Sequence, residues 1–193
     1  MRSVATLAAG PLLVAEGCAP HARAAAITGP PTGAQMRDFV VLSSALLGIA
    51  AAKLAPDPDP ANTKADCFAA AQQHDAQKLA ELLAIVDANR TRTPAEIADV
   101  TLNGSGQESS FFAKAVMLAW LLGSWYDPAL LARAAASGSD APIPSTVISA
   151  NAYREAWAWK IAQTKAMGTS NQGFGYWTSA PRPLGDFIGE PEA

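Results

Sequence analysis

Apolar residues recur at helical spacing between the proline and glycine breaks of this 193-residue chain. Phe39, Leu42, Leu46 and Ile49 follow one another at intervals of three and four residues, which places them on one face of a helix. No stretch shows the alternation of apolar and polar residues, bounded by turn residues, that marks a half-buried strand. The sequence therefore predicts an all-α fold, a small single-domain helical bundle of about five to six helices.

Proline- and glycine-rich segments divide the expected helices from one another. Proline ends a helix because it lacks the backbone N–H, as in the run Pro56 to Pro60. Thr93 and Glu96 form a capping box around a proline at the first helical position, so a helix begins at Pro94. The expected helices run from Gln35 to about Leu54, from Asn62 or Thr63 to about Asn89, from Pro94 to before Asn103, from about Glu108 to Tyr126, from Pro128 to Ala136 and from Ser149 to Lys165.

The first expected helix is apolar on nearly every side. Val40, Val41 and Leu47 lie off the face that Phe39 and Leu42 mark. A helix of this kind needs burial on more than one side. In so small a chain, we interpret the excess as a sign of a partner.

The N-terminal segment has the order of residues of an export signal. Arg2 precedes an uncharged apolar stretch from Val4 to Val14, and small residues continue to Ala26. The stretch is too short to span a bilayer, which takes about 20 residues. We expect residues 1–26 to be an export signal segment and residues 27–167 to be the helical domain. The alternative is an amphipathic first helix that the mature protein keeps.

The C-terminal segment, residues 168–193, is expected to be an extended tail because it has glycines and prolines but no helical period. It nevertheless contains Phe174, Tyr176 and Trp177. Aromatic side chains in a segment without a core of its own need a surface to pack on. That surface is either the helical body or another chain.

Few residues could carry catalytic or metal chemistry. Beyond residue 26, Cys67 is the only cysteine and His74 the only histidine, whereas zinc, iron–sulfur and covalent haem sites need several such ligands. His74 lies in a polar stretch without a nucleophile motif, so we interpret it as a solvated helix-face histidine, and we expect Cys67 to be a buried thiol. Asp57 and Asp59 fit a solvated turn better than a cation site. We expect no catalytic, cofactor-binding or metal site in this chain.

Composition excludes further classes. Half of the residues are apolar, which excludes intrinsic disorder. The formal net charge of −3 offers no electrostatic footprint for nucleic acid. Five tryptophans could form a sugar-stacking platform, but most of them stand at helical spacing and are interpreted as core or interface anchors.

Three segments, taken together, resemble a known family. They are Phe39 to Gly48, Ala115 to Gly123, and Tyr153 to Trp157 followed by Gly173 to Thr178 and by Pro181. In that order and spacing they resemble the small (gamma) subunit of bacterial membrane-bound, FAD-dependent sugar and polyol dehydrogenases, such as the sorbitol, fructose and glucose dehydrogenases. The likeness covers most of residues 35–183, and its C-terminal Gly-Tyr-Trp region is the most specific part.

The resemblance implies a heteromeric complex. A large subunit binds FAD and oxidises the sugar alcohol, and a multihaem cytochrome c subunit passes the electrons to membrane quinone. The small subunit is not itself an enzyme: it binds the large subunit and supports its maturation and export, often through a twin-arginine signal, which residues 1–26 do not show. The chain is then expected to be periplasmic and attached to the inner membrane through the complex, without a membrane span of its own.

We expect the partner interface at the first helix and along the aromatic C-terminal residues, because aromatic anchors concentrate binding energy. The alternative hypothesis is an independent periplasmic carbohydrate-binding module that uses its tryptophans. The predicted interface residues are Phe39, Leu42, Leu46, Tyr153, Trp157, Phe174, Tyr176 and Trp177.

Overall fold

The structure is a computed structural model that describes residues 24–138, 140–164 and 183–189. The described part is predominantly helical, with one small two-stranded sheet, which confirms the predicted all-α class. In chain order the elements are α1 (Gly33–Leu47), α2 (Ala51–Leu54), α3 (Thr63–Ala88), α4 (Pro94–Asp99), the π-helical turn η1 (Val100–Gly104), α5 (Gln107–Leu122), β1 (Ser124–Tyr126), α6 (Pro128–Ser137), β2 (Ser145–Val147), α7 (Ala150–Arg154), α8 (Trp157–Ile161) and α9 (Gly185–Ile188).

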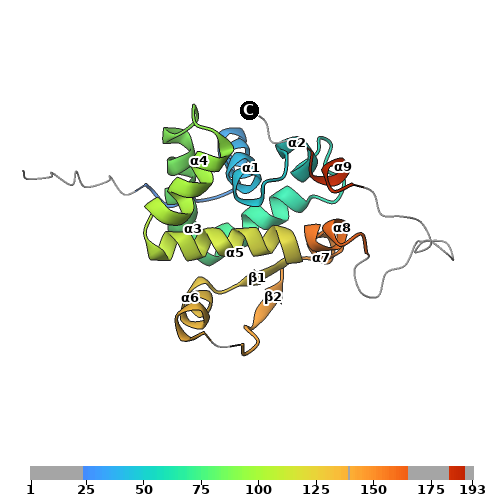
Figure 1. Cartoon of the computed structure of the whole chain (residues 1–193). Coiled ribbons are helices and arrows are strands. Elements are labelled where there is room, and N and C mark those ends of the chain that lie inside the picture. Colours follow the sequence, from blue (N-terminus) through green and yellow to red (C-terminus); the bar gives the residue numbers. More distant parts are fainter. Residues whose placement is uncertain (1–23, 139, 165–182, 190–193) are drawn as a thin grey trace, which may run out of the picture.

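Helices α1, α3, α4 and α5 form the helical body (Figure 1). The core lies where α1, α3 and α5 meet, and its centre is aromatic. The ring of Phe39 packs edge-on against Phe68, with ring centroids 5.2 Å apart, and stacks on Trp120 at 6.2 Å. All three rings are almost fully buried, so one residue from each helix locks the body together.

A polar pair lies inside this core. The indole N–H of Trp120 donates to the hydroxyl of Ser43 at 2.9 Å, and that hydroxyl donates to the carbonyl of Phe39 at 2.7 Å. Ser43 thereby gives the buried indole a partner without leaving its own proton unpaired. A buried donor that is satisfied in this way avoids the cost of desolvation.

The first expected helix, from Gln35 to about Leu54, divides into α1 and α2. Gly48 ends α1 in the left-handed region, with φ of 64°, and its N–H donates to the carbonyl of Ser44 at 2.9 Å. Helix α1 then packs against α2, α3, α4 and α5 of the same chain. These helices bury the face of Phe39, Leu42 and Leu46, whereas of the apolar residues off that face Val40 and Leu47 are partly buried and Val41 is 40% exposed.

Helix α3 confirms the helix that was expected from Asn62 or Thr63 to about Asn89, but its helical backbone is interrupted at one residue. Asp75 is extended, with φ of −158° and ψ of 92°. Its carboxylate accepts the N–H groups of Gln77 and Lys78 at 3.0 and 2.9 Å, so it caps the second half of α3 as an independent helix start.

Two other expected helices differ from the structure. The segment from Ser149 to Lys165 is not one helix, because Ala156 is extended, with ψ of 137°, and separates α7 from α8. The helix expected to continue to Tyr126 ends at Gly123, and β1 follows it. Strands β1 and β2 are antiparallel and only three residues long each, too short for a period of two to be recognised in the sequence.

Both ends of the described chain are fixed to the helical body. Ile27 is buried, and the side-chain amide of Gln72 donates to the carbonyls of Ile27 and Gly29 at 3.1 and 2.7 Å. At the other end, the N–H of Ala50 donates to the carbonyl of Ile188 at 2.9 Å, which holds α9 against α2. Within the expected tail, α9 is thus a short helix rather than an extended segment, and the remaining tail residues lie outside the described residues.

Replacing Ser43 with alanine is expected to lower the free energy of unfolding by about 1–3 kcal/mol, because the buried indole N–H of Trp120 loses its partner. The measurement is urea unfolding followed by circular dichroism. Ser137→Ala, at the exposed end of α6, is the control and is expected to change stability by less than about 0.5 kcal/mol. Equal effects of the two substitutions would contradict the inferred importance of the buried pair.

Two glycines that end helices in the left-handed region make a matched pair. A β-carbon added to Gly138, whose φ is 59°, would have no atom within 4 Å. A β-carbon added to Gly123, whose φ is 65°, would lie 2.4 Å from the α-carbon of Tyr153. Gly138→Ala is expected to cost about 1–2 kcal/mol, the conformational term alone. Gly123→Ala is expected to cost at least about 2 kcal/mol more, because backbone must move. Denaturant melts of both variants test the difference, and similar losses would refute the close approach.

Candidate partner-binding surface

The predicted interface residues fall into three groups. Phe39, Leu42 and Leu46 are buried in the chain's own core and do not form an exposed surface. Tyr153 and Trp157 lie on α7 and α8 and are described below. Phe174, Tyr176 and Trp177 lie outside the described residues.

The interface residues near the end of the described domain pack mainly on the chain itself. Trp157 is buried, with Lys160 Nζ 5.0 Å from the centre of its ring. Tyr153 is partly exposed and meets Trp159 edge-on at 5.6 Å. The indole N–H of Trp159 donates to the carbonyl of Tyr153 at 2.8 Å. Of these residues, the partly exposed pair Tyr153 and Trp159 remains within reach of a partner.

The tryptophans of the described residues do not form the platform that the carbohydrate-binding alternative needs. Trp120, Trp125 and Trp157 are each less than 5% exposed, and the indole of Trp159 is turned to the chain's own backbone. Trp177 lies outside the described residues. The described indole faces are therefore used for packing.

Partly exposed apolar side chains lie on an arm, which we define as residues 127–148, comprising α6, the loop after it and β2. Together with β1, this arm lies on one side of the helical body, below α5 in Figure 1. Asp127 starts α6 by accepting the N–H groups of Ala129 and Leu130 at 2.8 and 3.0 Å, and Pro128 takes the first helical position. Although α6 is rich in leucine and alanine, none of its residues is buried.

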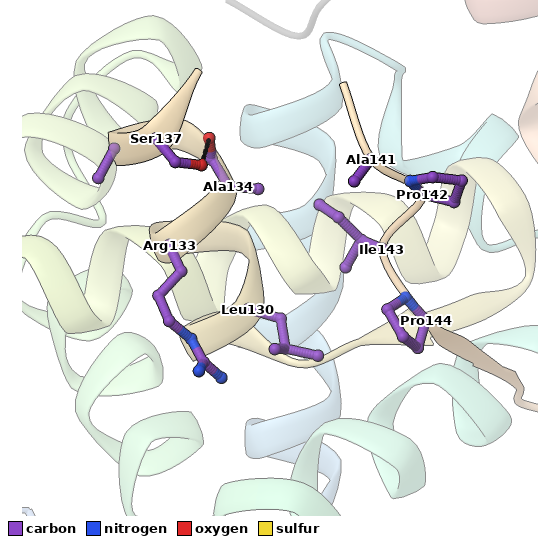
Figure 2. A pocket seen from close by; sticks show the side chains of 9 residues that line it. Leu130, Arg133, Ala134, Ser137, Ala141, Pro142, Ile143 and Pro144 are labelled. Atoms are coloured by element: carbon purple, nitrogen blue, oxygen red, sulfur yellow. Dashed lines mark hydrogen bonds between the residues drawn. The ribbon is translucent and has the colours of Figure 1, made fainter. Parts of the chain in front are cut away.

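A groove runs between α6 and the loop that leads to β2. It encloses about 600 Å³ and is open to solvent along its length. Figure 2 shows Leu130 and Ile143 extending into the gap from its two sides, with Pro144 beside them and Arg133 turning its guanidinium away. Its lining residues are Leu130, Arg133, Ala134, Ala136, Ser137, Ala141, Pro142, Ile143 and Pro144. A shallow apolar groove of this kind accepts an apolar side chain from a partner.

The exposed apolar surface continues past the groove onto β2. Val147 is 54% exposed, which is more than the other exposed large apolar side chains of the described residues. Sequence patterns predict no interface here, because residues 137–144 form a polar, proline-containing connection between two expected helices. The available signal was weak: Pro142, Ile143 and Val147 are apolar or rigid residues in an otherwise polar connection.

A second cavity, of about 550 Å³, lies where α3, α5 and α6 meet. Its wall includes His74, which is exposed at the helix face as predicted, and whose ring stacks on the buried Trp125 at 4.7 Å and 7°. Lys78 crosses the wall and pairs with Glu81 and Glu108 at 3.0 and 3.3 Å. The polar residues around His74 therefore have structural roles at the break in α3: His74 packs on Trp125, and Lys78 pairs with the two glutamates.

No set of three or more histidine, cysteine, aspartate or glutamate side chains within the described ranges is placed to hold a metal ion. Asp59, one of the two proline-bounded aspartates, instead accepts the N–H of Lys64 at 3.1 Å. Across the same ranges, every helix is too short or too polar to cross a bilayer.

Cys67 is the free cysteine of the described residues and is buried, as predicted. Burial raises the pKa of the Cys67 thiol well above its usual range, and the carboxylates of Asp66 and Asp59 raise it further. Since the thiolate is the reactive form, the folded chain holds this cysteine in an inert state.

In comparisons with known proteins, neither a protein-family model nor a curated protein nor a solved structure matches this chain.

Cys67 is expected to resist a thiol reagent in the folded chain and to react at once when the chain is unfolded, because both burial and the raised pKa suppress the thiolate. The measurement follows Ellman's reagent by absorbance at neutral pH, with and without denaturant. Ala71→Cys provides a second buried position of the same helix, and Ala69→Cys an exposed one that is expected to react without denaturant. Rapid labelling of native Cys67 would contradict the inferred burial.

Proposed function

We propose that this chain is a non-catalytic small subunit that binds the FAD-containing catalytic subunit of a periplasmic sugar or polyol dehydrogenase and supports its maturation and export. The complex would include a multihaem cytochrome c as its third subunit and would be held at the inner membrane through its other members. The family resemblance of residues 39–48, 115–123 and 153–181 supports this proposal. FAD and haem c belong to the partners in this assignment, and the chain itself carries neither.

The observation that carries the proposal is the exposed apolar arm. Helix α6 buries none of its residues, the groove beside it is lined by Leu130 and Ile143, and Val147 continues the apolar surface. Contiguous apolar surface of this kind marks sites of protein–protein association, since its exposure to water is unfavourable. The arm, rather than the buried face of α1, is therefore the surface that we assign to the large subunit.

The contacts of Ile27 are compatible with cleavage of the predicted export signal after Ala26. Its side chain is buried and its N–H donates to the carbonyl of Ala76 at 3.3 Å, while Ala25 and Ala26 just before it are exposed. Ala24, within the predicted signal, also packs against the core, and its carbonyl accepts the side-chain amide of Gln77. Cleavage after Ala26 would leave the contacts of Ile27 in place and remove those of Ala24.

Because the large subunit would perform the chemistry, the proposal assigns binding and stabilisation to this chain. A large subunit that folds against the arm would gain stability from that contact by mass action, as any ligand of the native state stabilises it. The sugar or polyol that is oxidised would be selected in the large subunit.

The test is purification of the tagged chain from its native host, followed by an absorbance spectrum of the eluate. The wild-type chain is expected to co-elute with a larger flavin-containing chain. Leu130→Asp places a charge in the groove and is expected to weaken this binding at least about tenfold, a loss of roughly 1.4 kcal/mol.

Ala95→Asp is the control, since Ala95 is exposed on α4 and lies outside the arm. It is expected to bind within about twofold of the wild type. Circular dichroism checks that both variants keep their helices. A colourless wild-type eluate without a larger chain would refute the proposed function, and equal binding by the two aspartate variants would remove the groove from the interface.

A further inference from the structure

Strand β2 has an edge whose backbone hydrogen-bonding groups are unused. In an antiparallel pair, residues alternate between those that bond to the neighbouring strand and those whose N–H and C=O point away from it. The N–H of Ile148 donates to the carbonyl of Gly123 at 3.0 Å, which fixes this alternation for the pair β1–β2. It follows that the backbone groups of Ser145 and Val147 point away from β1.

These outward groups lie in solvent. Every residue of β2 is exposed, and none of the backbone bonds found outside the regular elements of the described ranges involves Ser145 or Val147. Ser145 and Val147 thus offer two backbone N–H donors and two backbone C=O acceptors along the free edge of β2. Groups arranged in this way match the backbone of another extended chain, which adds to a sheet as a new strand.

The groove and the free edge are continuous. Ile143 and Pro144, which line the groove, directly precede β2. Ser145 and Val147 lie on the same face of the strand, because side chains alternate, and Val147 is half exposed there. A strand laid along β2 could therefore reach the groove between Leu130 and Ile143 with one of its apolar side chains (Figure 2).

We propose that an extended segment of the large flavoprotein subunit binds by adding a third strand to β2, with its backbone paired to Ser145 and Val147 and an apolar side chain in the groove. This inference rests on the proposed function and adds the mode of binding. A second copy of the chain is the less suitable occupant, because two-fold pairing would join only Ser145–Val147 to its equivalent, whereas a stable interface buries about 800 Å² on each partner. A larger partner can cover the strand, the groove and α6 together.

The experiment compares two substitutions at one position in the co-purified complex. Val147→Pro removes the outward N–H but leaves the bonds of β2 to β1, because proline is tolerated where its missing N–H faces away from the sheet. Val147→Thr keeps the N–H and the branched shape. We expect Val147→Pro to weaken binding of the flavoprotein at least about tenfold and Val147→Thr to stay within about twofold.

Hydrogen–deuterium exchange of the wild-type chain gives a second measurement that needs no variant. The amides of Ser145 and Val147 are expected to exchange rapidly in the free chain and to be protected in the complex, whereas the amide of Ile148 is expected to be protected in both.

The outcomes separate this inference from the proposed function. A flavoprotein complex that Val147→Pro leaves intact, without new protection at Ser145 and Val147, would overturn strand addition and leave the proposed function standing. A wild-type chain that captures no flavoprotein would overturn both. A free chain that light scattering shows to be a dimer, and that Val147→Pro converts to a monomer, would assign the edge to a second copy and overturn the partner proposed here.

Discussion

The turn at Gly123 is the constraint on which the arrangement of the arm depends. The residue ends α5 in the left-handed region and lies so close to the backbone of Ala152 and Tyr153 that no side chain fits between them. Its carbonyl also accepts the N–H of Ile148, which begins the pairing of β1 with β2. One glycine therefore ends the most apolar helix, starts the sheet and brings α7 against the body.

The helical body could be predicted from the sequence because its signals are local. The face of Phe39, Leu42 and Leu46, the capping box at Thr93 and the start of α3 all depend on residues within one or two turns. The interruptions of the expected helices could not be predicted from the sequence in the same way. The pairing of β1 with β2, and the contacts beside the break at Asp75 (the stack of His74 on Trp125 and the bond from Ile27 to Ala76), join segments that are distant in the sequence, which a periodicity does not contain.

The same distinction applies to the candidate site. An excess of apolar residues indicates that burial is needed, but not which surface supplies it. For α1 the covering surface is provided by four other helices of the chain, which bury the face of Phe39, Leu42 and Leu46 and leave Val41 exposed. For α6, whose composition is equally apolar, the fold leaves the helix without a buried residue. The interface remains a prediction, and the surface that we propose for it lies on the arm, where the sequence pattern is weak, rather than on α1.

The burial of Cys67 has a consequence for how the chain would pass through an oxidising compartment. The Cys67 thiol can form mixed disulfides only while α3 is not yet packed, since the folded body leaves it 1% exposed. The time during which oxidants can trap the chain is therefore the time it takes to fold. Packing of α3 then decides whether Cys67 stays a free thiol or is captured in a mixed disulfide.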